Sequence, residues 1–195
     1  MTNVGLLMPN ATPQASQSGP DHGLRVVVMG VCGSGKSTVG RALASALGAT
    51  FVEGDTLHPV ANVRTMASGT PLTDADRLGW LHAVAERLAD EQAFPSGVVV
   101  SCSALKLSYR NLLRAVAPGV RFVYLEGGAA ALDERLQLRG VHFMPASLLQ
   151  SQLDTLEAPQ TGENPVTLNI SLTVPELVSA AVLALGPDKA SNQTS

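Results

Sequence analysis

The chain has 195 residues, of which 45% are hydrophobic and 15% are charged. This length suits about one domain. The hydrophobic fraction is large enough for a buried core, although the charged fraction falls below the usual ~25%. Thirteen Lys and Arg residues against sixteen Asp and Glu residues give a net charge of −3. That balance argues against a protein that binds nucleic acid through bulk positive charge.

The sequence also argues against a secreted or membrane protein. Two cysteines, Cys32 and Cys102, cannot form a disulfide framework, and the four histidines show no zinc-binding spacing. The N-terminal residues lack a secretory signal pattern. The apolar stretch 177–185 is much shorter than the ~20 residues of a membrane span. We therefore expect a cytoplasmic protein with no membrane partner.

One folded domain is predicted between two polar ends. Residues 1–23 are rich in Pro, Ser, Gln, Asn and Gly and predict a disordered leader, and residues 186–195 predict a flexible tail. Between them, over 24–185, short β-branched runs alternate with helical patterns, which is typical of an α/β domain with a parallel sheet. The predicted strands are 24–29, 50–53, 98–101, 121–125 and 166–172.

Helical patterns lie between these strands. The first begins near Lys36 and ends at Gly48, a residue that suits the left-handed conformation at a helix end. Another begins after Thr73, with Asp76 three positions later as its capping partner. The strands 98–101 and 121–125 are each followed by a further helical pattern. The last helix opens at Pro175, because proline is favoured in the first helical turn.

The most specific motif follows the first strand directly. Residues 30–37 match G-x-x-x-x-G-K-[ST] at every fixed position, and they open a helix as a phosphate-binding loop does. In such a loop, backbone N–H groups surround phosphate oxygens. Lys36 reaches the β- and γ-phosphates, and the Ser37 hydroxyl binds Mg²⁺. The full motif disfavours a glycine-rich turn that binds nothing, and its spacing does not match the dinucleotide pattern G-x-G-x-x-G. The predicted ATP-binding residues are Gly30, Val31, Cys32, Gly33, Ser34, Gly35, Lys36, Ser37 and Thr38.

A candidate acceptor site follows the second strand. Asp55 comes directly after this strand, and the carboxyl ends of parallel strands face the ligand. Asp55 is therefore placed to accept a proton from an attacking hydroxyl group or to orient that group. The alternative is an aspartate that only caps the next helix. His58 either contacts the substrate or helps to set the turn before Pro59.

Three longer motifs resemble one known family. They read Gly54-Asp55-x-x-His58-Pro59-x-x-Asn62-x-x-x-Met66-x-x-Gly69-x-Pro71-Leu72, then Cys102-Ser103-Ala104-Leu105-Lys106-x-x-Tyr109-Arg110, then Ser151-Gln152-x-x-Thr155-Leu156-Glu157. Together they resemble the gluconokinases, small P-loop kinases related in fold to shikimate and adenylate kinases. The resemblance covers about 24–185.

The resemblance implies transfer of the γ-phosphoryl group of ATP to the 6-hydroxyl of D-gluconate, giving 6-phospho-D-gluconate and ADP. It also implies an α/β P-loop NTPase fold with a five-stranded parallel sheet, a mobile segment over the acceptor, a lid over ATP and a homodimer. One alternative is a related kinase for another sugar acid or for shikimate. Another is a nucleotide-binding protein without turnover, which would not need Asp55.

Gluconate carries a carboxylate, so its pocket needs cations. Arg77, Lys106 and Arg110 lie in the motif-bearing segments, and Lys106 and Arg110 share one helix face with Arg114. Arg110 is the preferred carboxylate anchor, because the planar guanidinium suits bidentate contacts. The alternative for this row is a solvated helix face.

Further cations are suggested by the resemblance. Relatives often carry a lysine where Thr65 stands here, so the neighbouring Arg64 becomes a candidate for substrate contact. Arg135 and Arg139 form an (i, i+4) pair just before the expected lid loop, which also contains His142. Arginines in this place neutralise the charge of the transferred phosphoryl group, an effect of roughly 10³–10⁵ in rate in related systems. A surface pair is the alternative.

Overall fold

The computed structural model describes residues 23–138 and 146–186. Its centre is a five-stranded parallel sheet in the order β2-β3-β1-β4-β5. The strands are β1 (Arg25–Met29), β2 (Thr50–Glu53), β3 (Val98–Ser101), β4 (Arg121–Glu126) and β5 (Val166–Asn169). The five-stranded parallel sheet that the resemblance implied is therefore confirmed.

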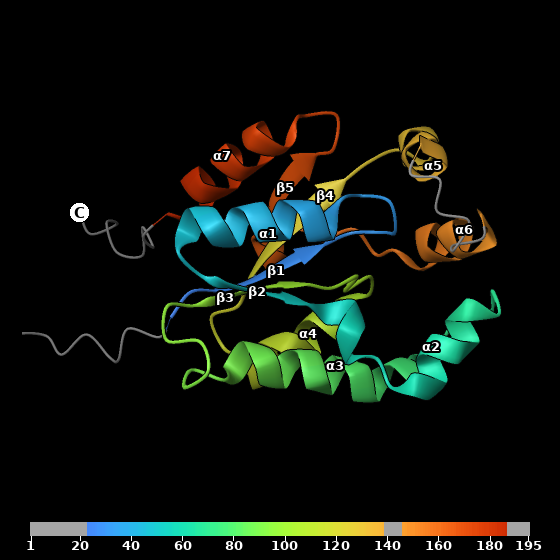
Figure 1. Ribbon diagram of the computed structural model, residues 1–195, viewed down its shortest axis with the longest axis horizontal. Helices are drawn as coiled ribbons and strands as arrows, with labels where there is room; N and C mark the ends of the chain where they lie inside the picture. Colours follow the sequence, from blue (N-terminus) through green and yellow to red (C-terminus); the bar gives the residue numbers. More distant parts are fainter. Residues whose placement is uncertain (1–22, 139–145, 187–195) are drawn as a thin grey trace, which may run out of the picture.

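Helices cover both faces of the sheet and its carboxyl end (Figure 1). Helices α1 and α7 pack together on one face, and α3 and α4 pack together on the other. Helices α2, α5 and α6 lie beyond the carboxyl ends of the strands. The bounds are α1 (Lys36–Leu47), α2 (Val60–Ala67), α3 (Asp74–Ala89), α4 (Leu107–Val116), α5 (Ala129–Leu138), α6 (Ala146–Thr155) and α7 (Val174–Leu185), with short 3₁₀ helices η1 (Gly54–Leu57) and η2 (Thr161–Glu163).

The central strand divides the core into two layers. Successive side chains of a strand point to opposite faces, and every residue of β1 is buried. Val26 and Val28 pack in the layer beneath α1 and α7, whereas Val27 and Met29 pack in the layer formed with α3 and α4. This two-sided burial explains why the strand is almost continuously apolar.

The helix ends predicted from local patterns are confirmed. Gly48 ends α1 in the left-handed conformation, with φ 66°. Thr73 and Asp76 form a capping box at the start of α3. The final helix α7 begins at Val174, one residue before the predicted proline, and has its own capping box between Thr173 and Glu176.

The last strand is shorter than the predicted 166–172, because it ends at Asn169. The Asn169 side chain accepts a hydrogen bond from the backbone N–H of Ser171 at 2.8 Å, which turns the chain away from the sheet. Helices α2 and α6 and both 3₁₀ helices were not predicted.

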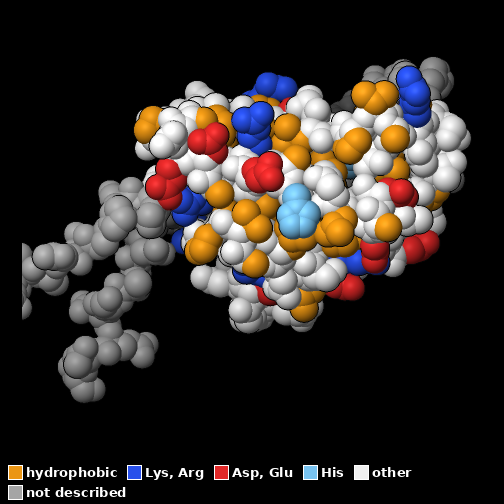
Figure 2. Space-filling view, turned by 90° about the horizontal axis from the view of Figure 1, so that it is seen from below, with side chains coloured by type: hydrophobic (Ala, Val, Ile, Leu, Met, Phe, Trp, Pro, Cys, Tyr) orange, Lys and Arg blue, Asp and Glu red, His pale blue; other side chains and the backbone are white. Residues whose placement is uncertain are grey.

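Within the described ranges, no helix is long and apolar enough to cross a membrane. The predicted leader and tail lie outside these ranges, except for Gly23 and Gly186. The face formed by α3 and α4 is seen from below in Figure 2, where acidic and basic side chains are interspersed rather than separated by sign.

Candidate active site

The phosphate-binding motif connects β1 to α1 at the carboxyl edge of the sheet. Gly30 has φ 143° and Gly35 has φ 97°, conformations that L-residues rarely adopt. A Cβ atom on Gly30 would also lie 2.8 Å from the carbonyl oxygen of Leu125. The Lys36 Nζ donates a hydrogen bond to the Val31 carbonyl at 3.0 Å, so the lysine lies across the loop. The glycines of the motif are thus required by backbone geometry.

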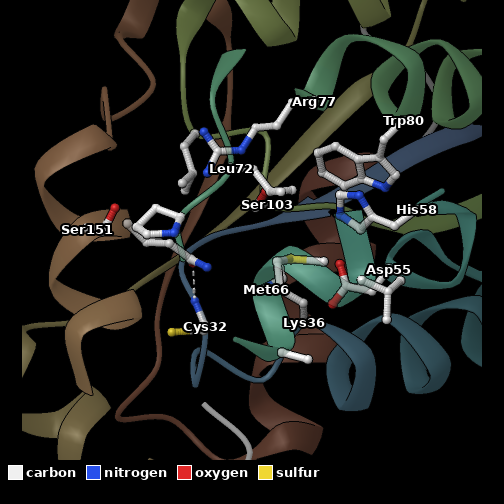
Figure 3. Close-up of a pocket in the computed structure, with 15 residues that line it drawn as sticks. Cys32, Lys36, Asp55, His58, Met66, Leu72, Arg77, Trp80, Ser103 and Ser151 are labelled. Atoms are coloured by element: carbon white, nitrogen blue, oxygen red, sulfur yellow. Dashed lines mark hydrogen bonds between the residues drawn. The ribbon is translucent and has the colours of Figure 1, made fainter. Parts of the chain in front are cut away.

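A cavity of about 210 Å³ opens beside this loop (Figure 3). Its wall combines residues from the phosphate loop, from η1 and from helices α2, α3 and α6. The segment that follows β3 also contributes. Two of the predicted catalytic residues, Lys36 and Asp55, both line it. The other lining residues are Cys32, His58, Val63, Met66, Ala67, Pro71, Leu72, Arg77, Trp80, Ser103, Leu105, Ser151 and Gln152.

Asp55, His58 and Trp80 form one side of the cavity, which we call the acceptor wall. This wall is built around Trp80. The Trp80 side chain is 1% exposed, and its Nε1–H donates a hydrogen bond to the Gly54 carbonyl at 2.8 Å. Gly54 begins η1, the turn that carries Asp55. The His58 ring stacks on the Trp80 ring. Burial lowers the pKa of His58, and the nearby Arg77 adds to this effect against the opposing charge of Asp55.

Arg77 is the cation that α3 brings to the cavity. Its Nη1 donates a hydrogen bond to the Tyr109 hydroxyl at 3.4 Å, and that hydroxyl in turn donates to Asp74. Burial, together with the hydrogen bond to Asp74, raises the pKa of Tyr109. Lys106 does not line the cavity, because its Nζ forms an ion pair with Asp74 at 2.7 Å.

The prediction that Arg110 anchors the substrate carboxylate requires a correction. Its side chain is 1% exposed, and two of its nitrogens donate to Glu163 at 2.6 and 2.7 Å. The remaining Nη1 donates to the carbonyl oxygens of Ala104, Leu105 and Glu157. Because its donors are occupied inside the protein and it does not line the cavity, Arg110 holds the fold together rather than anchoring a substrate carboxylate. Arg110 also holds the pKa of Glu163 at about 2.

Arg64 is likewise not brought to the cavity. It lies exposed on α2, whereas its neighbours Val63 and Met66 line the cavity. Arg114, at the end of the same row as Arg110, donates to Glu163 at 3.0 Å. The three basic side chains on α4 and at its start, including Lys106, therefore have acidic partners within the protein.

Arg135 lies beside the phosphate loop. It is half-buried on α5 and donates a hydrogen bond to the Ile170 carbonyl. Its Nη1 is 3.8 Å from where a Cβ of Gly35 would stand, so the guanidinium lies beside the loop. Arg135 also lines a second cavity, with Gly127, Gly128, Ala131, Glu134, Asn169, Ile170 and Ser171. The two other lid residues predicted, Arg139 and His142, lie outside the described residues.

Several lining residues were not predicted as site residues, among them Ser103, Ser151 and Gln152. Gln152 accepts a hydrogen bond from the backbone N–H of Cys32 at 2.7 Å (dashed in Figure 3). The periodicity of the sequence gave no sign of this contact, because helix α6 and the loop are distant along the chain. The only signal was the Ser151-Gln152 pair in the family motif.

Comparisons with known proteins agree on one family. A family model described as an AAA domain matches residues 26–159. The gluconokinase of Gluconobacter oxydans is 51% identical over 138 residues, covering 71% of this chain and 78% of that protein. The thermosensitive gluconokinase of Escherichia coli is 42% identical over 168 residues. The match covers 82% of this chain and 87% of the Escherichia coli protein.

Solved structures agree with these relatives. The crystal structure of a gluconokinase from Sinorhizobium meliloti has a TM-score of 0.77 and 51% identity, covering 84% of this chain and 92% of that one. The crystal structure of a sugar kinase from Janibacter has a TM-score of 0.79 and 43% identity. The match covers 84% of this chain and 94% of the Janibacter chain. The chain therefore belongs to the gluconokinase family and is a P-loop kinase of that family.

Proposed function

We propose that this protein transfers the γ-phosphoryl group of ATP to the 6-hydroxyl of D-gluconate. The observation that carries the proposal is the shared cavity, in which Lys36 of the phosphate loop stands with Asp55 and Arg77. A protein that only binds nucleotide has no need of an acceptor cavity that opens onto its phosphate loop. The family assignment supplies the acceptor, because the relatives are named gluconokinases.

Asp55 acts on the acceptor hydroxyl. The hydroxyl oxygen forms a bond to the γ-phosphorus while the bond between that phosphorus and the bridging oxygen of ADP breaks, and the hydroxyl proton passes to Asp55. A positioned carboxylate in this role typically contributes 10²–10⁴-fold to the rate. Because η1 is hydrogen-bonded to the buried Trp80, the Asp55 backbone is held in place before substrate binds.

The rest of the cavity suits a polyol carboxylate. Arg77 supplies a positive charge for the carboxylate, and Ser103 and Ser151 supply hydroxyl groups for the polyol chain. The apolar residues Met66 and Leu72 line the wall as well and limit the access of water, which would otherwise compete as acceptor.

ATP binds through the phosphate loop and the groups beside it. Lys36 releases the Val31 carbonyl and contacts the β- and γ-phosphates, while Arg135 neutralises charge on the transferred group. The second cavity, beyond Arg135, takes the nucleoside part. Mg²⁺ fits the oxygen donor that the half-exposed Ser37 offers in the first turn of α1; when bound with ATP, the ion neutralises phosphate charge.

The remaining predictions extend this proposal. Arg139 and His142 close over ATP from the lid, Arg64 turns toward the substrate from the exposed side of α2, and the protein works in the cytoplasm as a homodimer. Lys106 contributes by holding Asp74 in place.

The test is ADP release from purified protein with ATP, Mg²⁺ and D-gluconate. Three control reactions replace D-gluconate: one has no acceptor, one contains shikimate and one contains D-glucose. D-glucose has the 6-hydroxyl but no carboxylate. We expect turnover with gluconate alone and a product with the mass and NMR spectrum of 6-phospho-D-gluconate. Turnover with shikimate, or equal turnover with glucose and gluconate, would contradict the proposed acceptor.

A further inference from the structure

We propose that Gln152 positions the gluconate acceptor by presenting its side-chain NH₂ group to substrate oxygens, with its orientation set by the phosphate loop. This inference rests on the proposed function. It concerns a polar side chain of the cavity wall that comes from helix α6 and is hydrogen-bonded directly to the backbone of that loop.

The orientation of the Gln152 amide follows from its partner. The backbone N–H of Cys32 can only donate, so the amide atom 2.7 Å away has to be the oxygen Oε1. The Nε2 atom is then the other end of the amide, away from the Cys32 N–H. The hydrogen bond of the Gln152 side chain within the described residues is the one that Oε1 accepts from Cys32, and Gln152 lines the cavity. Two N–H donors are therefore available to a ligand.

The helix that carries Gln152 is held firmly. Leu149 of α6 is 6% exposed and belongs to the hydrophobic core, and Leu153 packs against that core from the next turn. Gln152 lies between these two residues in the sequence, so its backbone has a defined position relative to the phosphate loop. The Gln152 donor is fixed by the packing of α6 and by the hydrogen bond from Cys32 to Oε1. Such a donor loses little conformational freedom when substrate binds.

The chemistry of the amide suits this acceptor. Gluconate is rich in hydroxyl and carboxylate oxygens, all of which accept hydrogen bonds from an NH₂ group. The amide is neutral, so it adds donors without altering the charge balance between Lys36, Asp55 and Arg77. Since Oε1 is bonded to the phosphate loop, a substrate oxygen bound by Nε2 lies next to that loop, where transfer takes place.

Gln150 offers a matched comparison on the same helix. It is exposed, and its Nε2 donates to Asp154 at 2.7 Å rather than lining the cavity. Substituting both glutamines in the same way separates an effect on the cavity from an effect on helix α6.

The experiment compares steady-state kinetics of the full-length wild type, Gln152→Met, Gln152→Glu and Gln150→Met, with thermal unfolding as a folding check. Gln152→Met keeps the length of the side chain but removes both polar ends. We expect its KM for gluconate to rise about tenfold, the cost of lost hydrogen bonds, while its KM for ATP changes less than twofold. Gln150→Met should match the wild type.

Gln152→Glu distinguishes the two ends of the amide. The carboxylate can still accept the Cys32 N–H, but it has no donors and repels an anionic substrate. If the NH₂ group positions gluconate, this variant has an even higher KM for gluconate than Gln152→Met. Near-normal kinetics for Gln152→Glu would show that only the contact with the loop matters and would overturn the proposal.

Two other results would also overturn it. One is an unchanged KM for gluconate in Gln152→Met, and the other is a parallel rise in the KM values of both substrates. The wild-type reaction in the same assay separates this proposal from the proposed function. Absence of gluconate-dependent ADP release by the wild type overturns the function and this role together, whereas normal wild-type turnover with an unaffected Gln152→Met overturns this role alone.

Discussion

The imidazole of His58 stacks on the indole of Trp80, with ring centroids 4.2 Å apart and an interplanar angle of 12°. The same indole donates a hydrogen bond to Gly54, directly before Asp55. One buried side chain of α3 therefore holds two separate parts of the acceptor wall. This explains how a short 3₁₀ turn with an exposed aspartate keeps a defined position at the mouth of the cavity.

The stacked histidine makes stability depend on pH. Burial lowers the pKa of His58 in the folded protein below its usual value near 6.5. At pH values between the two pKa values, the unfolded chain therefore binds more protons than the folded protein does. The free energy of unfolding should therefore fall as the pH drops below about 6.5. His58→Phe keeps a stacked ring without titration and should flatten this dependence in thermal melts between pH 7.5 and 5.5. The same substitution at exposed His82 is the control, and an unchanged slope in His58→Phe would contradict the assignment.

The carboxylate of Asp55 should matter for transfer but not for nucleotide binding. In Asp55→Asn the side chain keeps its size but loses its capacity to take the acceptor proton, so kcat should fall by about 10²–10⁴-fold. ATP affinity, measured by equilibrium binding, should change less than threefold. Asp90→Asn at the end of α3 is the control, because asparagine can still accept the hydrogen bond from Ala93. A kcat near that of the wild type would mean that Asp55 is structural.

The Tyr109 hydroxyl should set the position of Arg77. Tyr109→Phe removes the link between Arg77 and Asp74 without removing either charge. We expect a three- to tenfold higher KM for gluconate with kcat nearly unchanged, because a single hydrogen bond contributes about 0.5–1.5 kcal/mol. Arg77→Lys should cause a larger rise, since an ammonium group cannot make bidentate contacts. Equal kinetics for Tyr109→Phe and the wild type would show that Arg77 is held by other contacts.

The ion pair between the buried Arg110 and the partly buried Glu163 should be a major source of stability. Removing one partner of a buried ion pair typically costs 3–5 kcal/mol, so Glu163→Gln should lower the free energy of unfolding by about 3 kcal/mol. The exposed Glu86 on α3 provides the control substitution, with a change near zero. Urea unfolding followed by circular dichroism measures both.

The same pair has a defined acid limit. Because Arg110 lowers the pKa of Glu163 to about 2, the unfolded chain binds more protons than the folded one below the usual carboxyl range. The stability that Glu163 contributes is therefore complete above about pH 4.5 and is lost as the pH falls toward 2. Glu163→Gln should lose less stability than the wild type between pH 5 and 3. A parallel loss in both proteins would contradict this role for the ion pair.

Much of this protein is determined within short windows of its sequence. The apolar run of β1, the glycines of the phosphate loop and the Thr73–Asp76 capping box each depend on residues only a few positions apart. Backbone geometry and hydrophobic periodicity act over these distances, so the fold class and the ATP-binding loop follow from local patterns. Motifs of similar length also carried the resemblance to gluconokinases.

The partners of the polar side chains were decided by the tertiary structure. Arg110 shares a helix face with Lys106 and has the features of a substrate cation, but folding brings Glu163 to it from 53 residues away. Gln152 reaches the phosphate loop across 120 residues. A charge or an amide has the same local sequence signal whether its partner is substrate or protein, because the free energy of the contact depends on which group the fold brings within 3 Å of it.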